Sequence, residues 1–101
     1  MGYNVTYSGK LKFVIEPNLK QLSKLNSLLE NVDLQLLDDY SGLQHNGAEK
    51  SNRLYVVINY LIRDMRRTWP EFDLKGTLKA RGEDGECWEI VVENAQAKEI
   101  S

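Results

Sequence analysis

Polar and apolar residues alternate along the first part of the chain. Between Tyr3 and Ile15 the odd positions are apolar or aromatic, apart from Gly9. The even positions include Thr6, Ser8, Lys10 and Lys12. A period of two predicts a strand over 3–15 that has one face on the core and the other in water. Gly9 favours a bulge or a bend in its middle.

Leucines at helical spacing follow in residues 16–31. They are Leu19, Leu22, Leu25, Leu28 and Leu29. Such a stripe is typical of a helix that packs on its own sheet, and a partner-binding groove is the alternative. Pro17 suits a helix start, and Asn18 followed by Gln21 three residues later matches a capping box.

The longest helix is predicted over residues 51–69. Its apolar positions recur every three or four residues and are Leu54, Val57, Ile58, Leu61, Met65 and Trp69. Arg66 and Arg67 lie in the last turns, where cations favour the negative end of the helix dipole. Pro70 is expected to end the helix.

Residues 33–45 contain a weaker strand signal. Leu34 and Leu36 flank Gln35, which indicates a strand over about 33–38. Two acids and a Ser-Gly pair then interrupt the alternation in the manner of a turn. We expect a second short strand near 42–45, although a loop fits these residues as well.

The C-terminal part has the pattern of a hairpin. Even residues from Phe72 to Ala80 are apolar or small, and so are the even residues from Trp88 to Val92. We expect these even residues to face the core. The tail is then expected to turn at 94–96 and to add a short final strand.

The register of this hairpin follows from parity. Side chains that pair across an antiparallel ladder share a face, and the even residues of both these strands face the core, so the residue numbers of a pair in this hairpin must sum to an even number. A five-residue loop at 82–86 meets this condition and a four-residue loop does not. It pairs Ala80 with Trp88 and sets two lysines opposite acids, namely Lys79 opposite Glu89 and Lys75 opposite Glu93.

The predicted element order is β-α-β-(β)-α-β-β, which defines the α+β class. We expect two helices packed on one face of a mainly antiparallel sheet of four to five strands, in a single domain over 1–101. If 42–45 is a strand, the core becomes βαββαβ, the ferredoxin-like arrangement, with extra strands at the C-terminus.

Composition places the chain among globular proteins, with 42% hydrophobic and 28% charged residues. The net charge is −2 and the pI is near 5.4. No global basic field therefore recruits nucleic acid or an anionic membrane, although a local patch remains open. The one cysteine, Cys87, excludes an intramolecular disulfide and a cysteine-based metal cluster. No apolar run approaches the ~20 residues of a membrane span, so we expect a cytoplasmic protein.

Titratable residues are most concentrated in residues 38–51, DDYSGLQHNGAEKS. Asp38, Asp39, His45 and Glu49 have side chains that can bind a divalent metal, and a metal-assisted hydrolase would use Asp38, Asp39 and His45. Their spacing matches no zinc or calcium motif, and His45 is the only histidine in the chain. We therefore predict a connector first and a binding surface second, with no catalytic residue, metal or cofactor.

Arginines and tyrosines provide the better candidate for binding. The candidate residues on helix 51–69 are Arg53, Tyr60, Arg63, Arg66 and Arg67. Arginine and tyrosine are over-represented among the residues that dominate protein interfaces, and arginines also bind phosphates. An ordinary solvated helix face is the plainer interpretation. Asp38, Asp39 and Tyr40 form the second candidate surface.

Two short motifs carry a resemblance. The first motif is a pair of acids followed by an aromatic–Ser–Gly, then by Asn/Asp-Gly, and then by a Glu-Lys that opens a helix. The second motif is a Gly-Glu-Asp hairpin whose second strand carries a Trp. The matching positions are Asp38, Asp39, Tyr40, Ser41, Gly42, Asn46, Gly47, Glu49, Lys50, Gly82, Glu83, Asp84 and Trp88. In these motifs the chain resembles small uncharacterised proteins of bacteriophages and prophages, over nearly its whole length. His45 stands where that pattern has an aromatic residue.

The resemblance implies a viral origin and brings no catalytic residue with it. Small acidic phage proteins commonly act by binding, and often block a host machine such as an immune nuclease complex. We therefore expect a non-enzymatic anti-defence inhibitor, of the anti-CRISPR kind, that contacts a host protein complex in the host cytoplasm. The alternative is a binder of nucleotides or nucleic acid through the arginines, and a metal-assisted hydrolase is least favoured.

Overall fold

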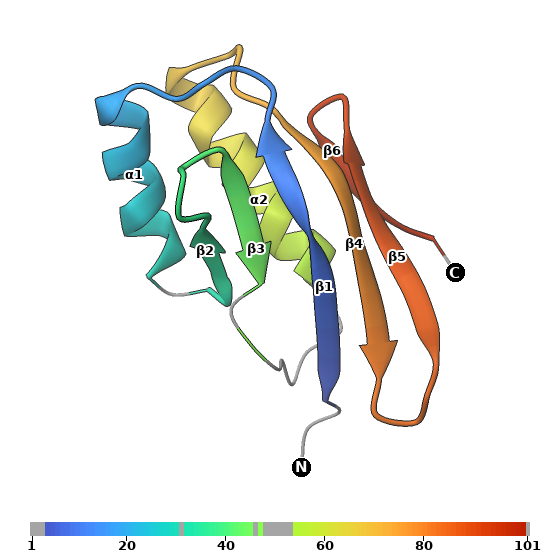
Figure 1. Cartoon of the computed structure of the whole chain (residues 1–101). Coiled ribbons are helices and arrows are strands. Elements are labelled where there is room, and N and C mark those ends of the chain that lie inside the picture. Colours follow the sequence, from blue (N-terminus) through green and yellow to red (C-terminus); the bar gives the residue numbers. More distant parts are fainter. Residues whose placement is uncertain (1–3, 31, 46, 48–53, 101) are drawn as a thin grey trace.

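The computed structural model describes residues 4–30, 32–45, 47 and 54–100. The elements are β1 (Val5–Phe13), α1 (Leu19–Leu29), β2 (Leu34–Leu36), β3 (Gly42–His45), α2 (Leu54–Thr68), β4 (Leu74–Gly82), β5 (Cys87–Glu93) and β6 (Gln96–Ile100). The strands form one antiparallel sheet in the order β2-β3-β1-β4-β5-β6, and both helices lie against the same face (Figure 1). The α+β class is confirmed, with six strands in place of the four to five expected.

Local sequence signals account for both helices. In α1 the Asn18 side-chain oxygen accepts from the Gln21 backbone N–H at 2.9 Å, and the Gln21 side-chain oxygen accepts from the Asn18 N–H at 2.8 Å. The predicted capping box is therefore confirmed. α2 ends at Thr68, before Pro70, as expected. The predicted start of this helix, 51–53, lies outside the described residues, as does Tyr3 at the start of the first strand. In the part of the chain that the structure describes, neither helix is long and apolar enough to cross a membrane.

The predicted hairpin register is confirmed. β4 and β5 pair Ala80 with Trp88 and Lys79 with Glu89. The Gly82 N–H donates to the Glu86 carbonyl at 2.8 Å and closes the five-residue loop. The ladder ends before the expected Lys75–Glu93 pair. The final turn is at Asn94 and Ala95, whose φ values of 52° and 60° are those of a type I′ hairpin turn.

The long ladder between β1 and β4 forms the centre of the sheet. It pairs Val5 with Gly82 at one end and Phe13 with Leu74 at the other. Gly9 and Gly76 lie in its middle with φ values of 108° and 149°, which side chains with a Cβ rarely adopt. A Cβ on Gly76 would lie 2.5 Å from the Lys10 carbonyl oxygen. The two glycines therefore permit the close approach and the bend of the central strands.

The far edge of the sheet is tied to α2 by one side chain. Asn59 donates its Nδ2–H to the Ala97 carbonyl at 3.0 Å and accepts the Ala97 N–H on Oδ1 at 2.8 Å. Because β6 is the outermost strand yet contacts α2, the sheet must curl around this helix. Asn59 also satisfies edge groups that would otherwise pair with another strand, which is how natural sheets limit edge-to-edge association.

The predicted strand at 42–45 is confirmed as β3, and it lies directly beside β1. Gly42 is paired with Lys12 and is buried. A Cβ built on Gly42 would overlap the Leu11 carbonyl oxygen and would lie 2.9 Å from the Lys12 Cα. Glycine is thus required here for backbone approach. This explains the Gly of the Ser41-Gly42 pair, because any side chain would push β3 away from β1.

We expect Gly42→Ala to destabilise the fold by about 1–3 kcal/mol, because backbone atoms must shift to admit the methyl group. Gly47→Ala is the matched control, since a Cβ on Gly47 meets nothing within 4 Å. Urea denaturation followed by circular dichroism measures both. Equal midpoints for the two variants would contradict the close approach.

We expect Asn59→Ala to lower the free energy of unfolding by about 1–2 kcal/mol, because two half-buried backbone hydrogen bonds lose their partner. Asn26→Ala on the exposed side of α1 is the control and should change little. Amide hydrogen exchange adds a local readout: the Ala97 amide should exchange faster in the Asn59 variant alone. Unchanged protection of that amide would show that Asn59 does not hold the edge.

Candidate functional site

The acidic residues Asp38 and Asp39 lie in a tight connector between β2 and β3. The Asp39 carboxylate accepts from the Ser41 N–H at 3.0 Å and from the Ser41 hydroxyl at 2.6 Å. These hydrogen bonds hold the pKa of Asp39 below its usual value. The Leu37 N–H donates to the Gly42 carbonyl at 2.9 Å, and Tyr40 takes a φ of 60°. Asp39 and Ser41 thus have a local structural role, which agrees with the predicted connector.

Tyr40 stands out from this connector with 57% of its surface exposed. Asp38 and Asp39 are exposed beside it. The three residues of the second candidate surface therefore lie together at one turn. The turn gives Tyr40 a left-handed φ, and this backbone conformation fixes the position of the residue.

His45 lies at the other end of β3, and its side chain packs on the core-facing side of the sheet. Its ring centroid is 4.9 Å from that of Tyr7, and its Nδ1 accepts from the Gly47 N–H at 3.2 Å. Its Nε2 is buried and has no hydrogen-bond partner among the described residues. Burial lowers the pKa of His45, and the nearby charge of Asp33 opposes this shift. His45 is therefore a neutral packing residue at pH 7.

The described residues do not bring together the ligand group that the least favoured alternative, a metal-assisted hydrolase, would need. Asp39 precedes β3 while His45 ends it, and Glu49 lies outside the described residues. Within the described ranges, no group of three or more His, Cys, Asp or Glu side chains is placed to hold a metal ion. Asp39 and His45 instead serve the turn and the core.

The three described arginine candidates of α2 make three different contacts. Arg66 donates to the Phe72 carbonyl at 2.8 Å and ties the helix end to the segment before β4. Arg67 forms a surface ion pair with Asp64 at 3.5 Å, of a kind that contributes little to stability. The Arg63 guanidinium lies 5.7 Å from the centroid of the Tyr60 ring, a cation–π distance. Arg53 lies outside the described residues.

Tyr60 borders an apolar hollow between the two helices. Its side chain is 62% exposed. The hollow, of about 190 Å³, is lined by Leu28, Val32, Val57, Tyr60, Leu61 and Asp64. Tyr60, Arg63 and Arg67 follow one another on successive turns, so they share one side of α2. An exposed aromatic ring, an apolar depression and flanking cations thus meet on the helical face of the protein.

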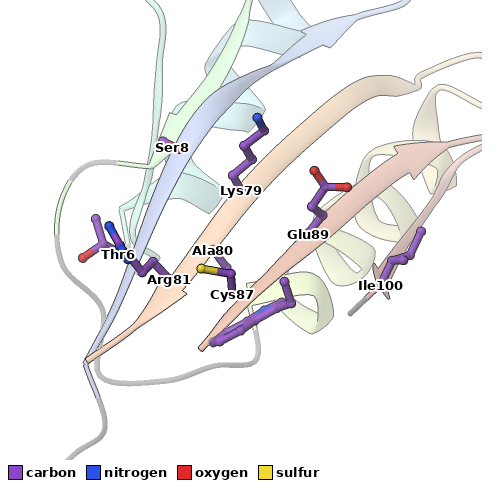
Figure 2. A pocket seen from close by; sticks show the side chains of 9 residues that line it. Thr6, Ser8, Lys79, Ala80, Arg81, Cys87, Glu89 and Ile100 are labelled. Atoms are coloured by element: carbon purple, nitrogen blue, oxygen red, sulfur yellow. The ribbon is translucent and has the colours of Figure 1, made fainter. Parts of the chain in front are cut away.

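Neither helix of the described residues covers the opposite face of the sheet (Figure 1). Even residues of β1 and odd residues of β4 point there, and the register sets them side by side. Among them are Thr6, Ser8, Lys79 and Arg81, which line an open hollow together with Cys87, Glu89 and Ile100 (Figure 2). The sequence pattern predicted that these strand residues face water. The alternation by itself did not indicate that β1 and β4 are neighbours.

No family model, curated protein or solved structure matches this chain. The function is therefore inferred from the residues and their geometry.

We expect the stability of the protein to fall as the pH drops from 7 to 5. The folded-state pKa of His45 lies below its unfolded value of about 6.5, so the unfolded chain binds the proton first as the pH falls. Stability is therefore lost as the pH falls below the unfolded pKa, until the folded pKa is passed. His45→Phe should reduce this loss and should keep the stability at pH 7, since it retains a ring beside Tyr7. Urea midpoints at both pH values test this. An unchanged pH dependence in the variant would show that another group is responsible.

Proposed function

We propose that the protein is a non-enzymatic binding protein that contacts a partner protein through the exposed side of α2. The observation that carries the proposal is Tyr60, which is exposed beside the apolar hollow and stacked with Arg63. Protein interfaces combine an apolar, aromatic centre with a polar rim. Here the hollow and Tyr60 would form the centre, and Arg63 and Arg67 the rim.

The same proposal holds that the protein does not catalyse a reaction. Asp39 of the connector is used in the turn, and the lone histidine is used in packing. A surface that acts by complementarity needs none of these groups. The resemblance to small phage proteins suggests the partner: a host defence complex in the host cytoplasm, which the protein would inhibit or modulate.

We place nucleotide or nucleic-acid binding by the arginines of α2 second. Arg66 is engaged with the Phe72 carbonyl and Arg67 with Asp64. Arg63, the remaining arginine of the described α2 surface, lies over the ring of Tyr60. A phosphate-binding surface needs several free cations, and an interface centre needs an exposed aromatic residue, so the geometry favours a protein partner.

We also infer that β1, α1, β2, β3, α2 and β4 form a ferredoxin-like core. The order of these elements is βαββαβ, and the strands lie in the order β2-β3-β1-β4, all antiparallel. This supports the arrangement that the sequence allowed. In this view β5 and β6 are a C-terminal hairpin added beside β4.

The protein-binding proposal is tested with the double variant Tyr60→Ala/Arg63→Ser. Partners captured from bacterial host lysate are identified by mass spectrometry, and the dissociation constant is then measured with the purified partner. Loss of an interface centre should raise this constant about 30-fold or more, because such residues contribute about 2 kcal/mol or more. The melting temperature should stay within a few degrees, since both side chains are exposed.

Leu19→Ala/Lys20→Ser on α1 is the matched control. It also removes one exposed apolar side chain, with Leu19 84% exposed, and one positive charge. The control should bind like the parent protein. If the Tyr60/Arg63 variant binds the partner at full strength, the exposed side of α2 is ordinary solvated surface. A capture that nuclease treatment abolishes would favour the second candidate.

A further inference from the structure

The uncovered face of the sheet carries a concentration of positive charge on its two central strands. The residues, which we call the basic stripe, are Lys10 and Lys12 on β1 and Lys75, Lys79 and Arg81 on β4. All five side chains are exposed. They alternate with hydroxyl residues, because the ladder sets Thr6 opposite Arg81, Ser8 opposite Lys79 and Thr77 opposite Lys10. No acidic residue of β1 or β4 points to this face.

Charge is unevenly divided between the faces of this protein. The strand residues that share the uncovered face include six cations, namely the five residues of the basic stripe and Lys98. They also include two acids, Glu89 and Glu93. Their sum is +6 − 2 = +4, whereas the whole chain carries −2. The rest of the chain must therefore carry about −6. A local positive field exists although the overall pI is acidic.

Among the described residues, no salt bridge involves a cation of the basic stripe, although the charge of Lys10 contributes to the lowered pKa of Asp39. The salt bridge that the described residues do form is on α2, between Arg67 and Asp64. Lys79 and Glu89 are paired in the ladder and lie side by side in Figure 2, yet no salt bridge joins them. Lys12 and Lys75 are directly opposite each other, an arrangement of like charges that destabilises a sheet. Folding alone does not account for this placement.

We propose that the basic stripe binds the phosphate backbone of single-stranded nucleic acid, independently of base sequence. Lysine, arginine, serine and threonine are the side chains that bind phosphate oxygens in such complexes. The outward residues of β1 and β4 include no apolar or aromatic side chain, since they are lysine, arginine, serine and threonine. Apolar lining of the hollow beside Lys79 and Arg81 comes from Ala80, Trp88 and Ile100, so most of the stripe lacks the apolar centre that a protein interface needs. A phosphate backbone can be bound by charge alone.

The dimensions of the stripe favour one strand over a duplex. Its two β-strands lie about 4.8 Å apart, and from Lys75 to Arg81 it runs about 20 Å at roughly 3.3 Å per residue. Glu89 and Glu93 on β5 border it on one side. A second phosphate backbone would meet these carboxylates. A single backbone would follow the cations and make at most five phosphate contacts, one for each residue of the stripe.

The test uses fluorescence anisotropy with a dye-labelled, mixed-sequence single-stranded DNA and the same sequence as RNA. For five phosphate contacts the slope of log affinity against log salt should approach about −3.5, which weakens binding about 100-fold between about 50 and 200 mM salt. Lys12→Gln/Lys75→Gln should reduce the slope by about 1.4. Lys20→Gln/Lys24→Gln, the control, removes two exposed charges from α1 and should keep the parent slope.

Lys75→Glu adds a readout that a merely structural residue would not give. It places an acid opposite Lys12, so the melting temperature of the free protein should rise by about 1–5 °C. Binding of the labelled strand should fall at the same time. A variant that is more stable and binds less well indicates that the like-charge pair serves binding. A fall in melting temperature together with unchanged binding would overturn this assignment.

Four results would overturn the proposal. The first is no change in anisotropy up to about 100 μM protein at about 50 mM salt. The second is an equal loss of affinity in the stripe variant and in the α1 control, and the third is tighter binding of a duplex than of a single strand. The fourth is competition by polyglutamate that is as strong as competition by unlabelled DNA. The last result would assign the stripe to acidic proteins. Tyr60→Ala/Arg63→Ser should bind the labelled strand normally, so failure of this proposal and failure of the α2 proposal are separable.

Discussion

The ladder between β1 and β4 is the constraint on which the other contacts depend. It joins two strands separated in sequence by residues 14–73, and each of them carries the next strand of the sheet, β3 on one side and β5 on the other. Gly9 and Gly76 allow the two backbones to bend together at its centre. That bend lets the sheet curl until β6 meets α2 at Asn59. The apolar face is thereby enclosed between the curled sheet and two helices, with Leu11, Ile58 and Leu78 fully buried.

This architecture gives the protein two outer surfaces that differ in physical character. On the helical side an exposed aromatic ring borders an apolar hollow, so burial of apolar area would supply the affinity. On the sheet side the central strands offer cations and hydroxyls, so affinity there would come from charge and would be sensitive to salt. The two surfaces share no residue, since one is built on α1 and α2 and the other on the strands. Each is therefore open to substitution without direct effect on the other.

The sequence predicted what depends on local periodicity and did not predict what depends on distant neighbours. Alternation identified the strands, parity identified the Ala80–Trp88 register, and Asn18 with Gln21 identified the helix cap. Lys10 and Lys79 were each expected to face water, yet their gathering on one surface follows only from the pairing of β1 with β4. The role of Asn59 was hidden for the same reason, because its partner Ala97 is brought to it by the tertiary fold.

The separation of β1 from β4 also fixes the order in which the protein can become folded as it is synthesised. The ribosome delivers β1, both helices and the β2–β3 hairpin before β1 has its central partner. Until β4 emerges, the core-facing side chains of β1, such as Val5 and Leu11, have no neighbouring strand on that side. Loop closure over so many residues is slow compared with local helix formation. The nascent chain thus passes through a stage in which helices are present and an apolar strand is still exposed, the stage at which a cell's chaperones would meet it.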